Sequence, residues 1–356
     1  MTIHPGTSVD TATRDAAIEP YKAIALQLET RAVNELGPVD ARAQMMEGIA
    51  RVGRQIRASK AFVGPDCRLV VLPEYFLTGF PMGETAEQWR EKACLSTDGP
   101  EYKALAGIAR ENGIFLSGNA YETDLHFPEL YFQVSFVIDP EGYTVLRYRR
   151  LNSMYTPTPH DVLKRYVSVY GQASLFPVAK TAIGNLACVA SEEIVYPEIA
   201  RCLAFNGAEV FLHSSSEVGS PMPTQKNIAK LARAFENMAY VVSANSAGIT
   251  GYAIPANSTD GHSQVVHYEG MKLCEAGYGE SMAANATIDI EAVRRHRRRP
   301  GMTHFLSRQR FELFAQTYSG SVYPADNLEG GLSGRKHFTD LQQRVIEELR
   351  ARGVIQ

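Results

Sequence analysis

The sequence has few cysteines and no long apolar run. Its five cysteines are scattered, odd in number and never spaced as CxxC, which argues against a disulfide framework and against a zinc site. We therefore expect neither a metal nor a cofactor. No hydrophobic run approaches the roughly 18 residues that a membrane span needs, and no basic segment precedes an apolar one at the N-terminus. We expect a cytoplasmic protein that has no membrane partner.

The sequence also lacks an excess of charge of one sign. Lys and Arg number 36 and Asp and Glu number 39, a net charge of −3, so the overall balance does not point to nucleic acid. One basic run, RRHRRR at 294–299, allows a nucleic-acid interpretation, but the rest of the chain does not extend such a patch. We interpret the run as a solvated or subunit-contacting segment.

Apolar patterns alternate along the chain between strand-like and helix-like periods. Hydrophobic residues make up 45% of the 356 residues, which excludes a disordered chain and fits one large α/β domain or two domains. Predicted strands cover 23–28, 69–72, 114–118, 131–138, 144–148, 185–190, 209–213, 240–245, 263–268 and 284–288. Predicted helices cover 40–59, 101–112, 194–206, 224–238 and 339–351. Strands that alternate with helices indicate a layered α/β domain, and paired hairpins suggest two similar halves.

The ends of the chain differ in composition from its centre. We predict a flexible N-terminal arm at residues 1–20, the main domain at 21–293 and a C-terminal extension at 294–356. The extension carries apolar and aromatic side chains such as Phe311 and Phe314, which need a surface to cover. That surface is either the domain itself or a partner subunit.

Charged groups lie where two predicted strands end. Glu74 follows Pro73, which ends a buried strand and delivers the carboxylate to the sheet rim. Partial burial there suits a general base, and a plain surface acid is the alternative. Arg149 and Arg150 end another strand. Since side chains alternate on a strand, we expect one to face solvent and the other to face inward, towards a carboxylate such as that of Glu74.

A hydroxyl group lies at a third strand end. Ser191 follows the predicted strand 185–190, at a strand-to-helix turn. Backbone N–H groups at such an elbow can hold a developing oxyanion. Plain capping of the helix by the Ser191 side chain is the alternative.

Together these segments resemble the nitrilase superfamily of carbon–nitrogen hydrolases, over roughly residues 21–290. The strand-end glutamate of the family is matched by Leu72-Pro73-Glu74-Tyr75, its Tyr-Arg-Lys context by 145–150 and its elbow by 184–198. Further matches are Gly207-Ala208-Glu209-Val210 with Ser214-Ser215, Arg233 with Glu236-Asn237, Asn245 with Gly248, and Gly261-His262-Ser263. The resemblance implies an α/β fold, the αββα four-layer sandwich of the nitrilase type, in a homodimer or larger homo-oligomer.

Two positions depart from the pattern of the family. Where the family has a Lys this chain has Arg150, and where it has the nucleophilic Cys this chain has Ser191. Cys188 lies three residues back on the strand and should face the other side, and Cys202 should lie in the following helix. We interpret both cysteines as core residues. A Cys→Ser change made by engineering would explain Ser191 alone, whereas two coordinated departures favour a natural lineage.

The two departures change the available chemistry. A Cys is partly thiolate near neutral pH, whereas a Ser hydroxyl needs a base, and an Arg cannot give up its proton. His160, in the loop 151–166, is one candidate base for Ser191. His213 either contacts ligand or makes a structural hydrogen bond. The side chains to which we assign substrate contact are Tyr75, His160, Asp161, Glu192, His213 and Ser214.

Three functions are compatible with these residues. The first is a hydrolase of a small amide, carbamoyl or nitrile compound. In it Ser191 attacks, Glu74 is the base, and Arg150 with the backbone N–H after Ser191 holds the oxyanion. The second is an inactive homologue that binds a small carboxylate or amide ligand, with Arg150 as a clamp. The third, ranked last, is acyl transfer or addition of water by Glu74 alone.

Overall fold

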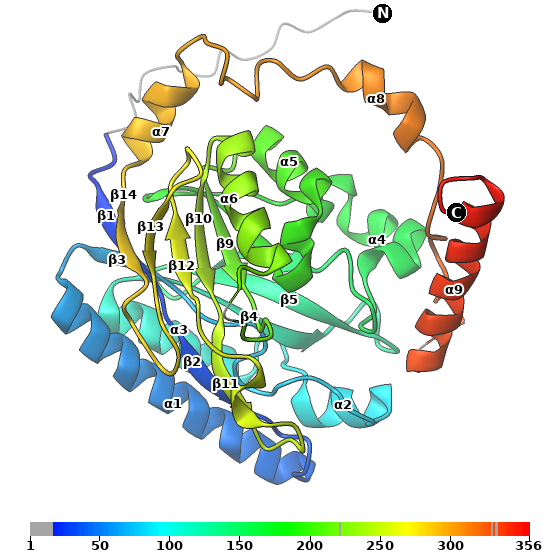
Figure 1. Cartoon of the computed structure of the whole chain (residues 1–356). Helices are drawn as coiled ribbons and strands as arrows, with labels where there is room; N and C mark the ends of the chain where they lie inside the picture. Colours follow the sequence, from blue (N-terminus) through cyan, green and yellow to red (C-terminus); the bar gives the residue numbers. More distant parts are fainter. Residues whose placement is uncertain (1–16, 221, 329, 332–333) are drawn as a thin grey trace, which may run out of the picture.

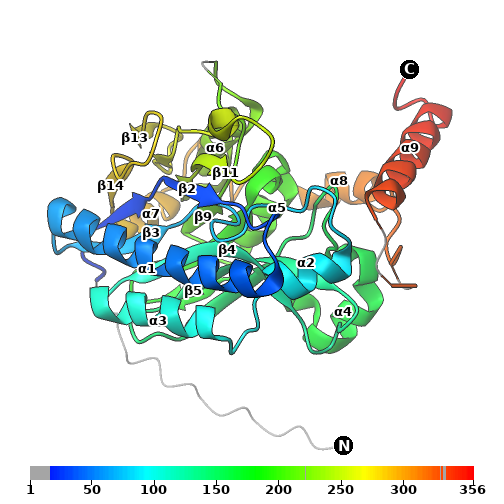
Figure 2. The same cartoon turned by 90° about the horizontal axis from the view of Figure 1, so that it is seen from below.

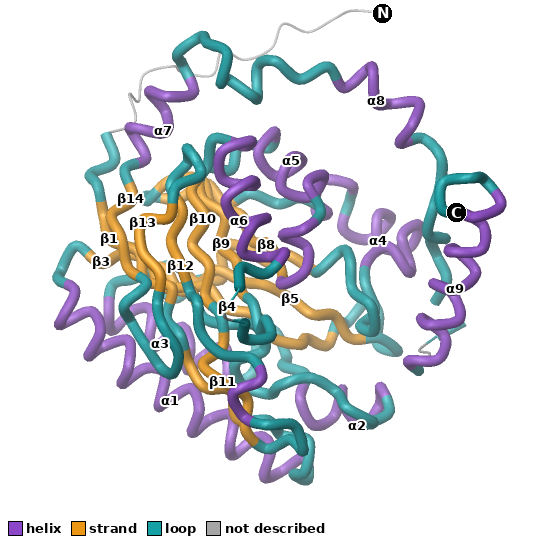
Figure 3. Tube along the Cα trace, in the orientation of Figure 1, coloured by secondary structure: helices purple, strands orange, loops and turns teal. Residues whose placement is uncertain are grey.

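The computed structural model of the chain describes residues 17–220, 222–328, 330–331 and 334–356. Residues 1–16, most of the predicted N-terminal arm, lie outside this part. Two six-stranded sheets stack face to face, and helices cover both outer faces (Figure 1, Figure 3). The predicted αββα four-layer sandwich is confirmed.

The strands fall into two large sheets and one small one. The first sheet has the order β14-β1-β3-β4-β5-β6 and the second has the order β13-β12-β10-β9-β8-β7. The strands of the first are β1 (Tyr21–Ala25), β3 (Cys67–Val71), β4 (Phe115–Thr123), β5 (Tyr131–Ile138), β6 (Thr144–Arg149) and β14 (Asn285–Ile288). The strands of the second are β7 (Ala179–Thr181), β8 (Gly184–Ala190), β9 (Val210–Ser214), β10 (Tyr240–Ala244), β12 (Gln264–Val266) and β13 (Lys272–Glu275). The small sheet pairs β2 (Leu28–Arg31) with β11 (Ser246–Thr250).

Helices on the two outer faces and at the C-terminus complete the described chain. On the first sheet lie α1 (Pro38–Val63), α2 (Ala86–Ala93) and α3 (Pro100–Asn112). On the second sheet lie α5 (Pro197–Phe205) and α6 (Gln225–Asn237). The others are α4 (Leu163–Tyr170), α7 (Ile290–Arg297), α8 (Phe311–Tyr318) and α9 (Arg335–Ala351). Short 3-10 turns are η1 (Pro159–Val162), η2 (Gln172–Leu175), η3 (Ser191–Val195) and η4 (Ala256–Ser258).

Both large sheets are built on one plan. Three neighbouring parallel strands, β1-β3-β4 in one sheet and β10-β9-β8 in the other, form the centre of each. An antiparallel hairpin extends each centre, β5-β6 beyond β4 and β12-β13 beyond β10. This repetition agrees with the two similar halves predicted from the order of the patterns.

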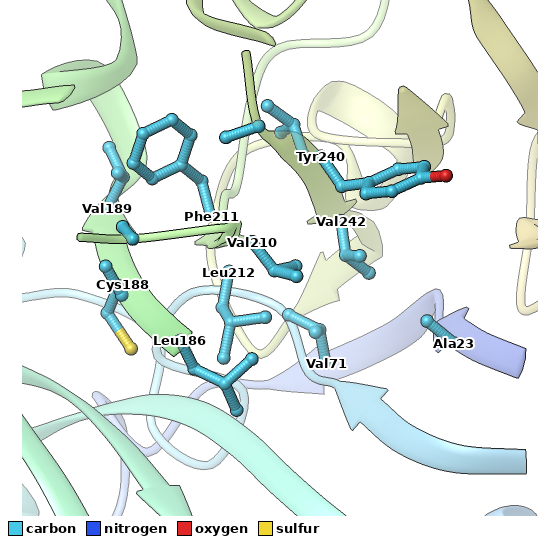
Figure 4. Packing of buried hydrophobic residues seen from close by; sticks show 14 of the residues in the cluster. Ala23, Val71, Leu186, Cys188, Val189, Val210, Phe211, Leu212, Tyr240 and Val242 are labelled. Carbon is cyan, nitrogen blue, oxygen red and sulfur yellow. The ribbon is translucent and has the colours of Figure 1, made fainter. Parts of the chain in front are cut away.

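The main core lies between the sheets. Figure 4 shows Ala23 and Val71 of the first sheet lying against Leu186, Leu212 and Val242 of the second. All five side chains are at most 1% exposed. Alternation along each strand turns the intervening residues towards the outer helices, so the central strands are apolar on both faces.

Stacking the sheets brings the carboxyl ends of parallel strands from both sheets to one rim. The Ser214 hydroxyl at the end of β9 donates to the carbonyl of Leu72 after β3, at 2.8 Å. The backbone N–H of Glu74 donates to the carbonyl of Ser215, at 3.2 Å. The strand end at Glu74 therefore meets the end of β9 across the sandwich, next to the end of β8 that leads into Ser191.

Several predicted elements need correction. The strand expected at 23–28 is two strands, because β1 ends at Ala25 and β2 pairs with β11 outside the large sheets. The helix expected at 194–206 is η3 followed by α5. The break falls at Tyr196 because Pro197 excludes helical backbone in the residue before it. Elements absent from the prediction are α2, α4, α7, α8, β7, β11 and β13.

The basic run at 294–299 contacts the domain of its own chain. Arg294, in α7, donates through Nε to Glu209 at 2.8 Å, and Arg297 donates through Nη2 to the carbonyl of Ala208 at 2.6 Å. These contacts anchor the root of the C-terminal extension. The interpretation of the whole run as solvated or contacting another subunit was therefore wrong for two of its arginines.

The rest of the extension leaves the sandwich on one side (Figure 2). Helix α8 buries none of its residues, and its Leu313 is 70% exposed. Helix α9 returns to the domain, where Phe338 and Leu341 are buried beside η1 and α4. Within the described part of the chain, no helix combines the length and the apolar composition needed to cross a bilayer.

Candidate active site

One cavity at the rim contains the three residues predicted to carry the chemistry. Glu74, Arg150 and Ser191 all line it, and its volume is about 250 Å³. The other lining residues are Tyr75, Phe80, Pro81, Tyr121, Gln133, Ser153, Met154, Tyr155, Thr156, Glu192 and Arg335. The cavity thus has an acid, a cation and a hydroxyl group in walls that also include four aromatic rings.

The two carboxylate oxygens of Glu74 differ in their hydrogen bonds within the described structure. The side chain is only 2% exposed. Its Oε1 accepts from Gln133 Nε2 at 2.8 Å and from Arg150 Nη1 at 3.1 Å. Among the described residues, Oε2 has no hydrogen-bond partner, so that oxygen can exchange a proton with a molecule in the cavity.

Four groups contact the guanidinium of Arg150. Its guanidinium pairs with Glu74 and, through Nη2, with Glu192 at 2.6 Å. It also donates to Gln133 Oε1 at 2.6 Å and to the carbonyl of Asn152 at 2.7 Å. Burial disfavours the charge, but the neighbouring carboxylates outweigh it and raise the pKa of Arg150 above its ordinary value. Arg150 is therefore a fixed positive charge.

The expectation that Arg149 faces solvent was wrong. Its side chain is only 12% exposed and pairs with Asp124 at 2.6 Å, while the guanidinium lies over the ring of Tyr170. Alternation does send the two arginines in opposite directions, as the strand period requires. The direction away from the cavity leads into a second cluster of aromatic side chains instead of water.

Ser191 takes up the elbow predicted from the sequence. Its φ of +48° lies in the left-handed region, which a residue with a Cβ adopts at a cost of about 1–3 kcal/mol. Tyr75, beside Glu74, also has a positive φ, +34°. Two strained residues thus flank the same cavity. Such strain persists only where the surrounding structure over-determines it.

The hydroxyl of Ser191 contacts a lysine that the sequence analysis missed. Lys226 Nζ, from the first turn of α6, donates to Ser191 Oγ at 3.0 Å. The carbonyl of Ser191 accepts from His213 Nε2 at 2.9 Å, and Ser243 Oγ lies 2.8 Å from His213 Nδ1. Burial, together with Lys230 and Lys226, holds the pKa of His213 well below its ordinary value, so this ring is neutral and both its nitrogens are engaged.

Glu193 is a second residue that the sequence analysis missed. It is completely buried and accepts from Tyr148 Oη at 2.8 Å and from the backbone N–H of Ala190 at 3.1 Å. Its other oxygen accepts from the N–H groups of Leu151 and Asn152 at 2.7 and 3.0 Å. Glu193 therefore fastens the Ser191 elbow to the chain that follows Arg150. The run of two acids after Ser191 was the available signal.

Replacing Glu193 by Gln should change how stability depends on pH. Burial outweighs the surrounding donors and raises the pKa of Glu193 to about 7. A carboxyl group that binds its proton more tightly in the folded state stabilises the fold fully below its unfolded pKa, near 4.5, and loses that contribution as the pH rises through about 7. The wild-type advantage over Glu193→Gln in free energy of unfolding should shrink between about pH 5 and pH 8.

Urea unfolding of both proteins across that pH range measures the effect. An advantage that grew with pH would mean that Glu193 is held as the charged form, contrary to the prediction. Glu198→Gln, which changes an exposed acid at the start of α5, serves as a control that should show little change.

Of the predicted substrate contacts, Tyr75 and Glu192 lie in the cavity. The ring of Tyr75 stacks on Tyr121, with centroids 6.3 Å apart and planes 4° from parallel. Glu192 keeps more than a third of its side chain exposed although it pairs with Arg150. A ligand in the cavity would therefore meet an aromatic wall on one side and a carboxylate on the other.

The other four predicted contacts have structural partners and do not line the cavity. The ring of His160 lies against Tyr323 of the extension, so its assignment as a base for Ser191 lacks support. Asp161 accepts from the N–H and hydroxyl of Thr158 and from Asn327. Residues His213 and Ser214 hold the rim through the bonds described above. The polar side chains of Asp161, His213 and Ser214 satisfy buried backbone and loop groups instead of lining the cavity.

Gln133 and Arg335 were also missed. Gln133, in β5, bridges Glu74 and Arg150, and nothing in an apolar strand pattern singles it out. Arg335, at the start of α9, donates to the carbonyl of Pro81 at 2.8 Å and lies over the ring of Tyr155. The extension thus reaches the mouth of the cavity.

The nearby cysteines do not take part. Cys188 is fully buried with its Sγ 3.9 Å from Ser117 Oγ, and burial raises its pKa to about 12. Cys202, in α5, is half-buried, and burial raises its pKa as well. Neither lines the cavity. Within the described residues, no three His, Cys, Asp or Glu side chains gather as a metal site.

Comparisons with known proteins agree with this architecture. The family model described as carbon–nitrogen hydrolase matches residues 27–298. A formamidase from Bacillus thuringiensis (strain Al Hakam) is 27% identical over 239 residues. That match covers 67% of this chain and 66% of the formamidase, so the chain spans slightly less than two thirds of that relative.

Solved structures share the fold. A Saccharomyces cerevisiae protein of branch 10 of the nitrilase superfamily is 21% identical, with a TM-score of 0.62, over 79% of this chain and 94% of the other. An amidase from Nesterenkonia sp. is 19% identical, with a TM-score of 0.56, over 87% of this chain and 100% of the other.

Proposed function

The chain belongs to the carbon–nitrogen hydrolase family, and on that basis we propose that it hydrolyses the carbon–nitrogen bond of a small amide, with Ser191 as the nucleophile. The observation that carries the proposal is the convergence of Glu74, Arg150 and Ser191 on one cavity. A formamidase and an amidase are among the proteins that this chain resembles, which supports an amide over a carbamoyl compound or a nitrile. No cofactor enters the proposed reaction.

The proposed reaction has two stages. Ser191 Oγ bonds to the amide carbon, the carbonyl electron pair moves to oxygen, and the backbone N–H of Glu192 stabilises the oxyanion. The carbon–nitrogen bond then breaks and the amine leaves with the proton that the Ser191 hydroxyl gave up, so that an ester to Ser191 remains. Water next attacks the ester, Glu74 Oε2 accepts its proton, and the carboxylic acid is released with Ser191 restored.

Arg150 has a narrower role in this proposal than the one expected from the sequence. Three of its five N–H donors are hydrogen-bonded to Glu74, Gln133 and the Asn152 carbonyl, and Nη2, which carries the other two, lies 2.6 Å from the Glu192 carboxylate. Its main task is to orient Glu74 and Glu192. The same engagement argues against the alternative of a non-hydrolytic protein that clamps a carboxylate with Arg150.

The size of the cavity supports a small substrate. A volume of about 250 Å³ lies below the roughly 300–1,000 Å³ usual for sites that bind drug-sized ligands. We assign substrate contact to Tyr75 and Glu192. Tyr75 belongs to the aromatic part of the cavity wall and Glu192 to its charged part. A short amide, with its N–H groups towards Glu192, suits this arrangement.

The test is ammonia or amine release by the purified protein from a panel of short amides, carbamoyl compounds and nitriles. Glu74→Gln is the comparison, because Gln keeps the two accepted hydrogen bonds at Oε1 and removes the proton acceptor at Oε2. We expect kcat to fall about 10²- to 10⁴-fold, the usual contribution of a general base. Full activity of Glu74→Gln would contradict the mechanism. Ligand binding without any release would favour the inactive homologue.

We also propose that the chain forms a homodimer or a larger homo-oligomer through the extension at 294–356. The support is α8, whose Leu313 and Phe314 are 70% and 46% exposed. The domain assignment of 21–293 and a cytoplasmic location belong to the same proposal.

A further inference from the structure

Ser191 Oγ accepts a hydrogen bond from a lysine that has no role in the proposed reaction so far. Lys226 lies in the first turn of α6 and its Nζ is 3.0 Å from Ser191 Oγ. Thr224 caps the helix by accepting from the N–H of Asn227 at 3.2 Å, which fixes the turn that carries Lys226. The lysine is therefore delivered to the nucleophile by a helix start.

Lys226 forms no ion pair with an acidic side chain among the described residues. Among the described residues, no Asp or Glu oxygen lies within 4.0 Å of Lys226 Nζ, although many other lysines in the chain have such a partner. The next basic group on α6, Lys230, is fully buried and pairs with Glu217 at 3.7 Å. Burial is the main cause that lowers the pKa of Lys230 to about 8, and the positive charge of Lys226 contributes.

Lys226 and Lys230 lie one helical turn apart on α6. Arg150, on the other side of the elbow, adds a third cation, and it is permanently charged. The acids of this region are committed elsewhere: Glu74 and Glu192 to Arg150, and Glu217 to Lys230. Lys226 is therefore the cation of this group that has no carboxylate partner among the described residues.

A serine nucleophile requires a partner that can take its proton. Arg150 cannot, since its guanidinium keeps its protons. His213 cannot, since both of its nitrogens are engaged with Ser191 O and Ser243. Glu74 is committed at Oε1 to Gln133 and Arg150, and among the described residues no hydrogen bond joins its free Oε2 to Ser191 Oγ. Only Lys226 is in hydrogen-bond contact with Ser191 Oγ among the described residues.

We propose that Lys226 is the general base that activates Ser191, so that the chain uses a Ser–Lys pair built across η3 and α6. This inference rests on the proposed function, of which it names one further catalytic residue. Neutral Lys226 accepts the Ser191 hydroxyl proton as Oγ bonds to the amide carbon and the carbonyl electron pair moves to oxygen. When the carbon–nitrogen bond breaks, the Lys226 ammonium returns that proton to the departing amine, and the ester remains for water to hydrolyse.

The test compares two substitutions at this position. Lys226→Arg keeps the positive charge and a donor to Ser191 Oγ but cannot accept a proton, whereas Lys226→Met removes both. We expect kcat on an amide substrate to fall about 10²- to 10⁴-fold in both variants, with KM little changed. An electrostatic or purely structural role would leave Lys226→Arg near wild type, and that result would overturn the proposal. Lys180→Met, which removes an exposed lysine on β7, is the control.

Shortening the Lys226 side chain allows a rescue experiment that would fail if the role of Lys226 were only structural. Lys226→Ala leaves space for a small primary amine, so added methylamine or ethylamine should restore part of the lost kcat, more for the more basic amine at equal free-base concentration. Circular dichroism checks that each variant is folded. A folded Lys226→Ala protein that no amine restores would count against the proposal.

A fluorophosphonate probe separates failure of this inference from failure of the proposed function. If the wild type hydrolyses amides and Lys226→Arg does too, the function stands and the inference fails. If the wild type hydrolyses no amide yet the probe labels Ser191, and Lys226→Arg lowers the labelling rate at least about 10²-fold, the function fails and the pair stands. A wild-type Ser191 that the probe does not label overturns the pair.

Discussion

Replacing Ser191 by alanine should lower kcat for amide hydrolysis by at least about 10⁴-fold while the protein remains folded. The large effect is expected because no ester can form without Oγ, and the remaining groups can only bind and polarise the substrate. Ala has a Cβ like Ser, so the cost of the positive φ at this position does not change. Ammonia release under saturating substrate measures the loss.

The change in stability should be small by comparison. The lost side-chain hydrogen bond is the one with Lys226, which is half-buried and can be solvated instead. The bond from His213 to the Ser191 carbonyl does not depend on the side chain. We expect a loss of about 1–2 kcal/mol in the free energy of unfolding, measured by urea denaturation.

A cysteine at the same position provides the matched comparison. In Ser191→Cys the thiol lies beside Lys226, and a neighbouring cation lowers the pKa of a thiol. It should react with iodoacetamide faster than Cys188, whose pKa burial raises to about 12. Intact mass after brief alkylation should show one fast adduct in the variant and none in the wild type. If Ser191→Ala kept most of its activity, the nucleophile would have to be another group.

The layered α/β class was predictable because several strands are buried on both faces, whereas the four-layer sandwich was implied by the resemblance to the nitrilase superfamily. Continuous apolar runs such as 69–72 and 186–190 are typical of strands in a sheet that is covered by another layer on each side. The elements that were missed lack such a signal. Helix α8 has only eight residues, so its apolar side chains at 311, 314 and 318 form too short a pattern to distinguish a helix from an extended covering segment. Strand β13 is an exposed edge strand, whose composition does not differ from that of a loop.

The site was predictable only where chain geometry sets it. Strand ends deliver Glu74, Arg150 and Ser191 to the rim, and that follows from the order of strands and turns. Lys226 comes 35 residues after Ser191 in the chain, and only the packing of α6 on η3 brings the two together. Their contact depends on tertiary structure, for which the spacing in the sequence gives no rule. The roles of these residues stay predictions.

Replacing Arg150 by methionine should destabilise the fold by about 3–5 kcal/mol. Met fills a similar volume but leaves the Glu74 carboxylate, 2% exposed, without its cation. Glu192 contributes much less because water reaches more than a third of its side chain. Urea unfolding of the variant and the wild type measures the loss. A change below about 1 kcal/mol would mean that Glu74 does not depend on Arg150 for its charge.

A second substitution separates the pair from the cavity that methionine leaves. In a Glu74→Gln background the carboxylate is already neutralised, so Arg150→Met should cost about 1–3 kcal/mol less than it does in the wild type. Equal costs in both backgrounds would show that packing, and not charge, explains the loss.

The substitution Arg150→Lys tests whether the site needs only a positive charge at this position or the planar guanidinium group. Lys keeps the charge beside Glu74 but gives up the planar fork that reaches Glu192 and the Asn152 carbonyl at the same time. If Arg150 acts as a fixed charge, Arg150→Lys should retain a larger share of the wild-type kcat than Arg150→Met does. Its free energy of unfolding should lie between those of the wild type and Arg150→Met. A kcat above that of the wild type would instead mean that the position profits from a residue able to release a proton. In that case Lys226 would no longer be the only candidate base for Ser191.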